Sequence, residues 1–475
     1  MDLFLPLVFL SVILIVLIFK PRSDGDKKLP PGSFGWPIMG ETIEFLFGHP
    51  KEFVDKRMKK YSPDIFKSNI LGEKTAIICG PEGHKFLFSN EEKFFTVFRP
   101  HPIQRLFRSY NNKSAPDPPP SGAGSKDDVK SIKQPGFFKP EALSRFIGVI
   151  EATIQQHLRA HWEGKDTVEA YPLSKSLTLT LSCRFFLGID NPERIARLVH
   201  MFDDITLGMH SIISNVPGTV FYRAKNAAAA VRKELLCVIK EKKQEMAAGK
   251  KAQDVLSHMI SFSDPSTGKF MPELEVADKM MGLITAGYST VATSMAFLMK
   301  FVGESPAIYN KIRAEQIELA ESKNPGEPLT WVDIQKLKYS WQAMCETMRL
   351  VPPLQGTFRE VINEFTYAGY TVPKGWKVYW TVSTVHMNPK YFPNPEKFDP
   401  SRYEEGKIST PYTYVPFGGG PRMCPGKEYA RIAVLTFLHH VVRKYKWEVL
   451  FPDEKVIGDM MPAPEKGLPI RLHPH

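Results

Sequence analysis

Cysteine is scarce in this 475-residue sequence: there are five, and no two of them form a CxxC pair. Their odd number and wide spacing exclude a disulfide framework and a structural zinc site, and indicate a reducing compartment. No similarity recurs at a period of about 20 to 50 residues, which excludes solenoids and propellers. The basic residues give a net charge of +11 but are scattered and form no RNP-like or finger motif, so we expect no nucleic-acid partner. An anionic membrane surface and an acidic protein partner suit this charge better.

Long apolar runs are equally rare, and the sequence has one, from Leu3 to Phe19. A helix of this length reaches about 26 Å, close to the thickness of the bilayer core. A cleaved signal peptide is the alternative, but no basic residue precedes the run and no small-residue cleavage site follows it. We therefore expect residues 1–20 to form a membrane anchor. The basic residues that come directly after it place the rest of the chain in the cytosol.

The remaining pattern predicts a mainly α protein with a minor β-sheet region. Ser305 and Pro306 are typical of a helix start, and Thr330 with Asp333 resembles a capping box that opens a helical pattern running to Leu350. Strand-like pieces are short and lie at residues 75–79, 365–373 and 377–382. The proline-rich stretch at residues 114–125 predicts a loop or disorder.

The stretch P-F-G-G-G-P-R-M-C-P-G, Pro416 to Gly426, holds a cysteine among residues that disfavour both helix and strand. Cys424 lies just before a predicted helix, whose N-terminal amides and dipole favour an anionic sulfur. The glycines allow the backbone to approach a large flat group, and Arg422 adds a fixed positive charge. A thiolate bound to haem iron, with Arg422 against a haem propionate, meets these demands. The alternative is a surface turn with an incidental cysteine.

The segment F-G-G-G-P-R-M-C-P-G resembles the haem-binding signature of the cytochrome P-450 superfamily, F-x-x-G-x-R-x-C-x-G, at every fixed position. The resemblance implies the P-450 fold, haem b as cofactor, Cys424 as the proximal iron ligand and Phe417 packed near the sulfur. In E-T-M-R, Glu346 and Arg349 resemble the E-x-x-R pair of the family. Arg402, in P-S-R-Y, is then the third partner, and we expect a structural role for all three.

The resemblance also implies residues that bind the haem propionates. Arg359, in G-T-F-R-E-V, occupies a position where family members often carry such an arginine; an ordinary strand-edge arginine is the alternative. The region at residues 114–134 departs from the family pattern, because it brings no arginine to the haem. Lys130 or Lys133 is expected to substitute weakly, since lysine lacks the planar fork of arginine.

The segment T-A-G-Y-S-T, from Thr285 to Thr290, resembles the oxygen-activating helix motif of the family. Gly287 is expected to open the helix for dioxygen, and the Thr290 hydroxyl to steer protons during oxygen activation. The alternative for Thr290 is packing, or a bond back to a helix carbonyl. Ser289 occupies the position of the usual acidic residue and is expected to relay protons through water.

The substrate pocket is expected to be apolar and rigid, with walls at residues 98–107, 207–213, 283–288 and 354–357. Core packing is the alternative for each stretch. Tyr288 is bulky and is expected to narrow the pocket above the haem. The complete set of predicted pocket residues is Tyr288, Ala286, Leu354, Gln355, Thr357 and Phe107.

Within the superfamily, stretches such as L-F-S-N-E-E-K and P-P-L-Q-G-T-F-R-E resemble plant members that oxidise triterpenoid skeletons. That implies a monooxygenase acting on a hydrophobic cyclic triterpenoid, such as an amyrin, with dioxygen. NADPH then supplies electrons indirectly, through NADPH–cytochrome P-450 reductase. We expect a monomer on the endoplasmic reticulum membrane, with a single-pass anchor, a basic and Pro/Gly-rich hinge at residues 21–41, and one catalytic domain at residues 42–475.

Three alternatives remain open from the sequence. The first is a hydroxylase of diterpenoids (taxane-like) or steroids. The second is a haem-thiolate enzyme that rearranges hydroperoxides without a reductase; Thr290 argues against it and Ser289 leaves room for it. The third is a catalytically impaired variant that binds haem or sterol, which the altered region at residues 114–134 suggests.

Overall fold

The computed structural model describes residues 28–36, 40–47, 50–108, 137–251, 254–263, 268–404, 407, 410–458 and 460–475. The predicted anchor, part of the predicted hinge, the proline-rich stretch, Lys130 and Lys133 lie outside these residues.

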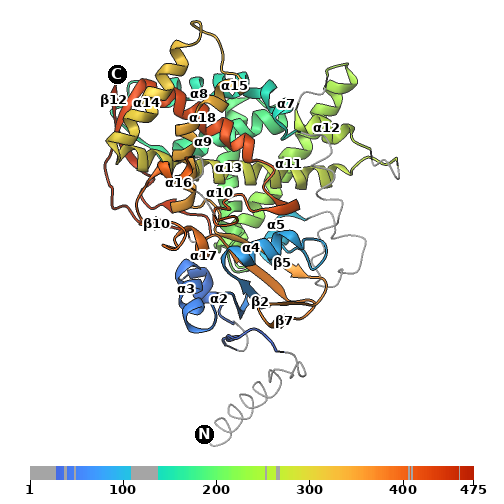
Figure 1. Ribbon diagram of the computed structural model, residues 1–475. Coiled ribbons are helices and arrows are strands. Elements are labelled where there is room, and N and C mark those ends of the chain that lie inside the picture. Colours follow the sequence, from blue (N-terminus) through green and yellow to red (C-terminus); the bar gives the residue numbers. More distant parts are fainter. Residues whose placement is uncertain are drawn as a thin grey trace, which may run out of the picture.

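Helices make up most of the described chain. Figure 1 shows most of them gathered at one end, with the larger β-sheet and several helices of the N-terminal part at the other. The longer helices are α3 (Pro50–Lys60), α4 (Gly80–Ser89), α8 (Ile147–His161), α9 (Ala170–Ser182), α10 (Pro192–Gly208), α11 (Val220–Ala247), α13 (Glu273–Gly303), α14 (Pro306–Glu321), α16 (Lys338–Leu350) and α18 (Lys427–Lys444). The shorter helices are α2 (Thr42–Phe47), α5 (His101–Phe107), α7 (Pro140–Leu143), α12 (Val255–Ser261), α15 (Trp331–Lys336) and α17 (Ser383–His386).

The larger sheet has five strands in the order β1-β2-β8-β5-β3. Its strands are β1 (Ile65–Ile70), β2 (Glu73–Ile78), β3 (Phe95–Val97), β5 (Gly356–Val361) and β8 (Lys377–Thr381). β2 and β8 pair in parallel, and the other neighbours pair antiparallel. Every residue of β8 is buried, which is typical of a strand covered on both faces.

The described residues also form three smaller sheets. A three-stranded sheet, in the order β4-β12-β9, joins β4 (Thr167–Glu169), β12 (Pro469–Pro474) and β9 (Tyr445–Val449). Two further pairs are β6 (Phe365–Tyr367) with β7 (Tyr370–Val372), and β10 (Val456–Ile457) with β11 (Ala463–Pro464). The last strand, β12, therefore ties the C-terminus to the segment before α9.

The elements predicted from turn and capping residues are confirmed, with one difference. α14 begins at Pro306, and the Thr330 and Asp333 side chains form the predicted capping box. The single helical pattern that runs to Leu350 is divided at Leu337 into α15 and α16. The break is one residue long, and its non-helical backbone separates the two helices.

Helix α13 is the central element of the helical core. It carries Glu273 and Glu275 in its first turn and Lys300 in its last turn, an arrangement that the helix dipole favours. By length and composition this helix is also apolar enough to cross a membrane, but most of its apolar window is buried inside the protein, mainly against α9 and α11. It is therefore the core helix of this fold.

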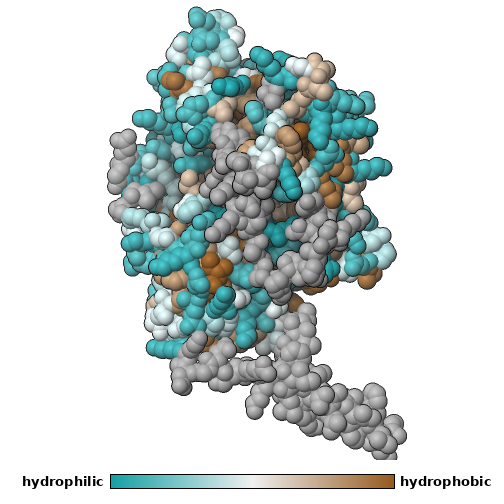
Figure 2. Space-filling model, turned by 90° about the vertical axis from the view of Figure 1, so that its right-hand side faces the viewer, coloured by the Kyte–Doolittle hydropathy of each residue, from teal (hydrophilic) through white to brown (hydrophobic). Residues whose placement is uncertain are grey.

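On the face shown in Figure 2 the described surface is mostly hydrophilic, with separate hydrophobic patches. Exposed apolar side chains include Leu207, Ile212, Val216 and Val220, which lie at and between the ends of α10 and α11.

The tight packing of α10 on α11 gives a test of the fold. A Cβ atom at Gly208 would lie 2.1 Å from the Cβ atom of Ala224, so Gly208→Ala must push the two helices apart. We expect a loss of about 1–3 kcal/mol in the free energy of unfolding. The control is Gly148→Ala in α8, where nothing lies within 4 Å of the added atom. Thermal unfolding should show a lower midpoint for the first variant and an unchanged or higher one for the second, and equal midpoints would contradict the packing.

Candidate active site

A cluster of buried charges on α16 supports the stretch Pro416–Gly426, which is called the cysteine loop below. The Glu346 and Arg349 side chains of α16 are fully buried. The Arg349 guanidinium donates two hydrogen bonds of 2.8 Å to the two Glu346 carboxylate oxygens. Arg402 donates to the same carboxylate at 3.0 Å, and the Tyr403 hydroxyl donates to it at 3.2 Å. The structure thus brings together all three members of the predicted structural trio.

A chain of bonds leads from this cluster to the cysteine loop. Arg349 donates to the backbone carbonyl of His386 at 2.8 Å. Burial holds the pKa of the His386 imidazole well below its usual value, so the ring is neutral and its Nε2 can accept a bond of 3.2 Å from the Val415 amide. Val415 in turn accepts from the Gly418 amide at 2.9 Å. The buried charges therefore position the start of the loop.

The loop itself is folded by glycine. Gly418 and Gly420 have φ angles of +70° and +63°, which side chains with a Cβ atom rarely adopt. A Cβ atom at Gly420 would also lie 2.4 Å from the carbonyl oxygen of Phe88. The Cys424 amide donates to the Phe417 carbonyl at 2.9 Å, which closes the loop just before α18.

The Cys424 side chain is accessible, in contrast to Cys79, Cys183 and Cys345, which are buried. The surrounding protein nevertheless raises the pKa of the Cys424 thiol by desolvation, and a backbone hydrogen bond from Gly426 opposes this rise. A metal cation bound to the sulfur would oppose this rise and favour the thiolate.

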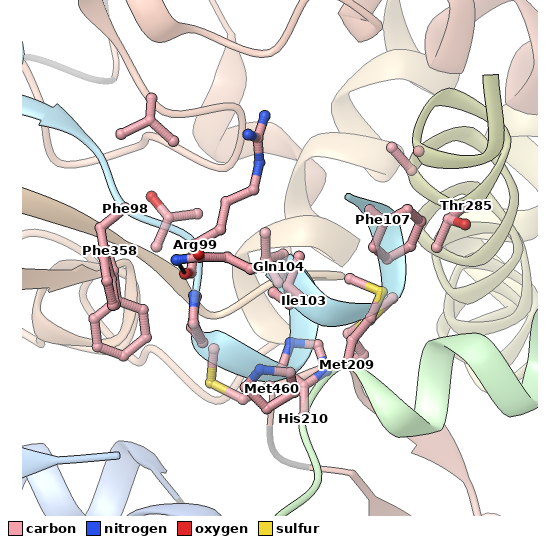
Figure 3. Close-up of a pocket in the computed structure, with 18 of the residues that line it drawn as sticks. Phe98, Arg99, Ile103, Gln104, Phe107, Met209, His210, Thr285, Phe358 and Met460 are labelled. Atoms are coloured by element: carbon pink, nitrogen blue, oxygen red, sulfur yellow. Dashed lines mark hydrogen bonds between the residues drawn. The ribbon is translucent and has the colours of Figure 1, made fainter. Parts of the chain in front are cut away.

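A cavity of about 740 Å³ lies beside the loop, between α5, α13 and β5. Figure 3 shows aromatic side chains of the cavity wall, among them Phe98, Phe107 and Phe358, on separate elements. Of the predicted pocket residues, Ala286, Leu354, Thr357 and Phe107 line this cavity, and Arg359, Arg422 and Thr290 line it as well.

Both predicted propionate-binding arginines have acidic partners. Arg359, on β5, donates to the buried Glu91 carboxylate at 2.7 Å and to the Thr357 hydroxyl at 2.9 Å. Arg422 lies 3.8 Å from Glu92. Desolvation raises the pKa of Glu91, while the Arg359 charge opposes the rise. The sequence patterns did not single out Glu91 or Glu92, since they lie far from either arginine in the chain.

Thr290 of α13 faces the cavity, and its hydroxyl donates to the Ala286 carbonyl at 2.7 Å. That bond is the helix back-bond weighed as an alternative, and it leaves the hydroxyl oxygen free to accept a further hydrogen bond. Ser289 is buried and is not part of the cavity wall. Gly287 does not line the cavity either, and a Cβ atom there would lie 3.2 Å from the Phe186 ring, so this glycine allows α13 to pack closely on Phe186. Its role in opening the helix for dioxygen stays a prediction.

Two of the residues predicted to line the pocket do not line the cavity. Tyr288 points away from the cavity and is fully buried, with its hydroxyl donating to Asp203 of α10. Burial and the Asp203 charge raise the pKa of this tyrosine, and Lys175 pairs with Asp203 at 2.6 Å. Gln355 does not line the cavity; its backbone carbonyl accepts hydrogen bonds from Thr381 and Val382.

The sequence patterns missed several cavity residues, because these come from segments far apart in the chain. Phe45, Leu71 and Met460 line the cavity although they lie in α2, after β1 and near β11. Their only signal is hydrophobicity, which does not distinguish a wall from a core.

The donor set fits a haem group. Among the described residues, no group of three or more His, Cys, Asp or Glu side chains could hold a bare metal ion. Haem iron fits a single protein sulfur ligand, because the porphyrin supplies four of the other ligands. Arg359 and Arg422 add cationic groups on the neighbouring cavity wall for two carboxylates.

Comparisons with known proteins agree with this geometry. The profile of the family described as Cytochrome P450 matches residues 30–462. The fold also matches the retinoic acid-bound cyanobacterial CYP120A1, with a TM-score of 0.83 and 28% identity, over 95% of this chain and 100% of the other. The chain belongs to the cytochrome P450 family. It is a haem-dependent monooxygenase of that family, and it works with a redox partner on a hydrophobic substrate.

Curated relatives match over almost the whole length. A beta-amyrin 28-monooxygenase from Saponaria officinalis is 46% identical, over 98% of this chain and 96% of the relative. A protopanaxadiol 6-hydroxylase from Panax ginseng is 43% identical, over 100% of this chain and 99% of the relative.

The buried cluster at Glu346 gives a stability test. Arg349→Met leaves the Glu346 carboxylate buried with Arg402 as its remaining charge partner, so we expect a loss of about 3–5 kcal/mol. The control is Arg471→Met, which removes a 3.1 Å ion pair with Glu448 in which both side chains are more than half exposed. That change should cost no more than about 1 kcal/mol. Thermal unfolding and haem content after purification measure both variants, and equal losses would contradict the role of the cluster.

Proposed function

We propose that this protein is a monooxygenase that oxidises one C–H position of a hydrophobic, polycyclic triterpenoid. The observation that carries the proposal is one apolar cavity whose wall includes Arg359, Arg422 and Thr290, beside the loop that presents the accessible Cys424 thiol. The relatives named as triterpenoid oxidases support the substrate class.

Cys424 is proposed as the protein ligand of the haem iron, and Arg359 and Arg422 as partners of its propionates. Haem bound through a thiolate supplies the chemistry that activates dioxygen. Phe417, whose carbonyl accepts from the Cys424 amide, holds the cysteine in place. The Glu346 cluster has a structural role, since it is buried and does not line the cavity.

Thr290 is proposed to hold and pass protons on the cavity side of α13. Its hydroxyl already donates to the Ala286 carbonyl, which fixes its orientation, so its oxygen can accept a hydrogen bond from a water molecule that carries a proton into the site. Ser289 is buried away from the cavity wall, so a proton path through this residue is not supported.

The apolar wall is proposed to orient the substrate and exclude bulk water. Phe98, Phe107, Phe358 and Leu354 approach from separate elements and leave a cavity of about 740 Å³, within the size range of ligand pockets. A rigid substrate held between such walls presents one C–H group at a time. The two relatives act at different positions, so the proposal names the substrate class and not the carbon.

The proposed setting is the endoplasmic reticulum membrane. The apolar run at residues 1–20 and a lipid-soluble substrate support a single-pass anchor, with residues 42–475 as one catalytic domain in the cytosol. NADPH–cytochrome P450 reductase is the proposed electron donor, and the net charge of +11 suits an acidic partner of this kind. We propose that the chain acts as a monomer.

Reconstituted turnover tests the function. Microsomes with the full chain and a plant reductase are incubated with beta-amyrin, NADPH and oxygen, and products are identified by mass spectrometry. An oxidised triterpenoid that requires both NADPH and reductase is the expected result. Products formed from a hydroperoxide without NADPH would identify a rearranging enzyme instead, and oxidation of steroids or taxanes but no triterpenoid would contradict the substrate class.

Thr290→Ala tests the proton role. Without the hydroxyl, NADPH consumption continues while protons arrive in the wrong place, so the yield of product per NADPH should fall about tenfold or more. Thr290→Ser keeps the hydroxyl and should retain most of the yield. The ratio of product to NADPH oxidised is measured for both variants; an unchanged ratio in the alanine variant would show that Thr290 only packs.

A further inference from the structure

Most polar side chains on the cavity wall already have partners within the described part of the chain. Asp278 pairs with Arg232 at 2.6 Å, and Lys279 pairs with Glu275 at 3.1 Å. Arg359 pairs with Glu91, and the Gln104 amide donates to the Arg99 carbonyl at 2.6 Å. Arg99 and Arg108 have partners as well. The hydroxyls on the wall donate to carbonyls of their own segments, as seen for Thr285, Thr290 and Ser211.

His210 differs from these residues. It lines the cavity just beyond the end of α10, and its imidazole makes no hydrogen bond to any residue that the structure describes. Figure 3 shows the ring next to Met209 and below Ile103 of α5. The side chain is partly exposed, so its ring nitrogens are open to a group that enters the cavity.

The position of His210 is fixed by tight packing. Gly208, two residues earlier, leaves room for Ala224 of α11, and a Cβ atom at Gly208 would also lie 3.5 Å from Leu106 of α5. Phe107, which follows Leu106 in α5, lies next to Gly282 of α13. Gly282 lies eight residues before Thr290, or about 12 Å along the helix axis. The histidine thus belongs to the part of the cavity remote from Thr290.

The charge state of His210 selects the kind of group that it can bind. Desolvation by the surrounding cavity wall lowers the pKa of this imidazole to about 4, so the ring is neutral at physiological pH. A neutral imidazole has one donor and one acceptor nitrogen, which match a hydroxyl group that can both accept and donate. A carboxylate or a phosphate prefers a cation, which the neutral His210 ring does not supply, so such a group is disfavoured at this position.

We propose that His210 binds a hydroxyl group on the substrate skeleton, remote from the carbon that is oxidised. This inference rests on the proposed function and narrows its substrate to a polycyclic alcohol. A rigid molecule anchored by its hydroxyl at His210 reaches back along α13 toward Thr290. His210 is therefore a positioning and specificity residue, and the hydroxyl it binds is present before the reaction.

The test compares two ligands that differ by one hydroxyl: a triterpene alcohol such as beta-amyrin, and the corresponding hydrocarbon that lacks the hydroxyl. Binding to the haem-loaded protein is followed by the substrate-induced change in the haem absorption spectrum. The wild type should bind the alcohol about tenfold more tightly than the hydrocarbon, as expected for the net contribution of one hydrogen bond. His210→Phe should remove this preference, and His210→Gln, which keeps a donor and an acceptor, should retain most of it.

The control is Thr206→Ala in α10, which removes a hydroxyl that is already bonded to the Phe202 carbonyl and does not line the cavity, and which should retain the preference. A wild-type preference that persists in His210→Phe, or a wild type that binds both ligands equally, overturns the inference. Turnover with NADPH and reductase distinguishes a failure of this inference from a failure of the proposed function. If the wild type oxidises both ligands and His210→Phe keeps the ratio of their rates, the proposed function stands and the role of His210 is contradicted. If the wild type oxidises neither ligand, the proposed function itself is contradicted.

Discussion

The structure depends on one buried carboxylate. Glu346 is fully buried, and a charge this deep is tolerated only when its oxygens are paired. Arg349 meets both oxygens, and Arg402, the Tyr403 hydroxyl and the Asp399 amide complete the shell. The same guanidinium of Arg349 also bonds the carbonyls of His386 and Pro395. One helix side chain thus fixes both the end of α17 and the irregular segment around Pro395.

The buried Glu346 cluster also positions the cysteine loop. His386 remains neutral because it is buried, and it can therefore accept from Val415 at the entrance of the loop. Positive φ angles at Gly418 and Gly420 then return the chain to α18. On the cavity side, Glu91 holds Arg359 in place through a buried ion pair. The candidate haem ligand and both arginines are thus positioned by neighbours that do not take part in the chemistry.

Much of this arrangement could be predicted from the sequence. The Glu346 and Arg349 spacing, the P-S-R-Y segment and the glycine-rich loop each impose a local geometry, and the structure brings those residues together. The errors on α13 have a simple cause. At about 100° per residue, Tyr288 lies about 200° from Thr290 and must face the other side of the helix. Ala286, four residues before Thr290, shares its face and does line the cavity.

Other residues could not be predicted because no local pattern marks them. Phe45 and Met460 both line the cavity, but they are far apart in the sequence and come together only in the folded chain. His210 stands out because its ring has no hydrogen-bond partner among the described residues, whereas most polar side chains around it do. Hydrogen-bond partners are not visible in a sequence. Glu91 belongs to the same class, since Arg359 lies 268 positions further along the chain.

The central claim is that the buried cluster and the loop present Cys424 as a thiolate ligand to haem. The most direct measurement is the carbon monoxide difference spectrum of the reduced full-length protein in microsomes, with Cys424→His as the comparison. The account predicts the Soret band characteristic of thiolate-ligated haem in the wild type, and its replacement by the band of a histidine-ligated haem in the variant. A wild type that binds haem without the thiolate band, or the same spectrum in both proteins, would contradict it.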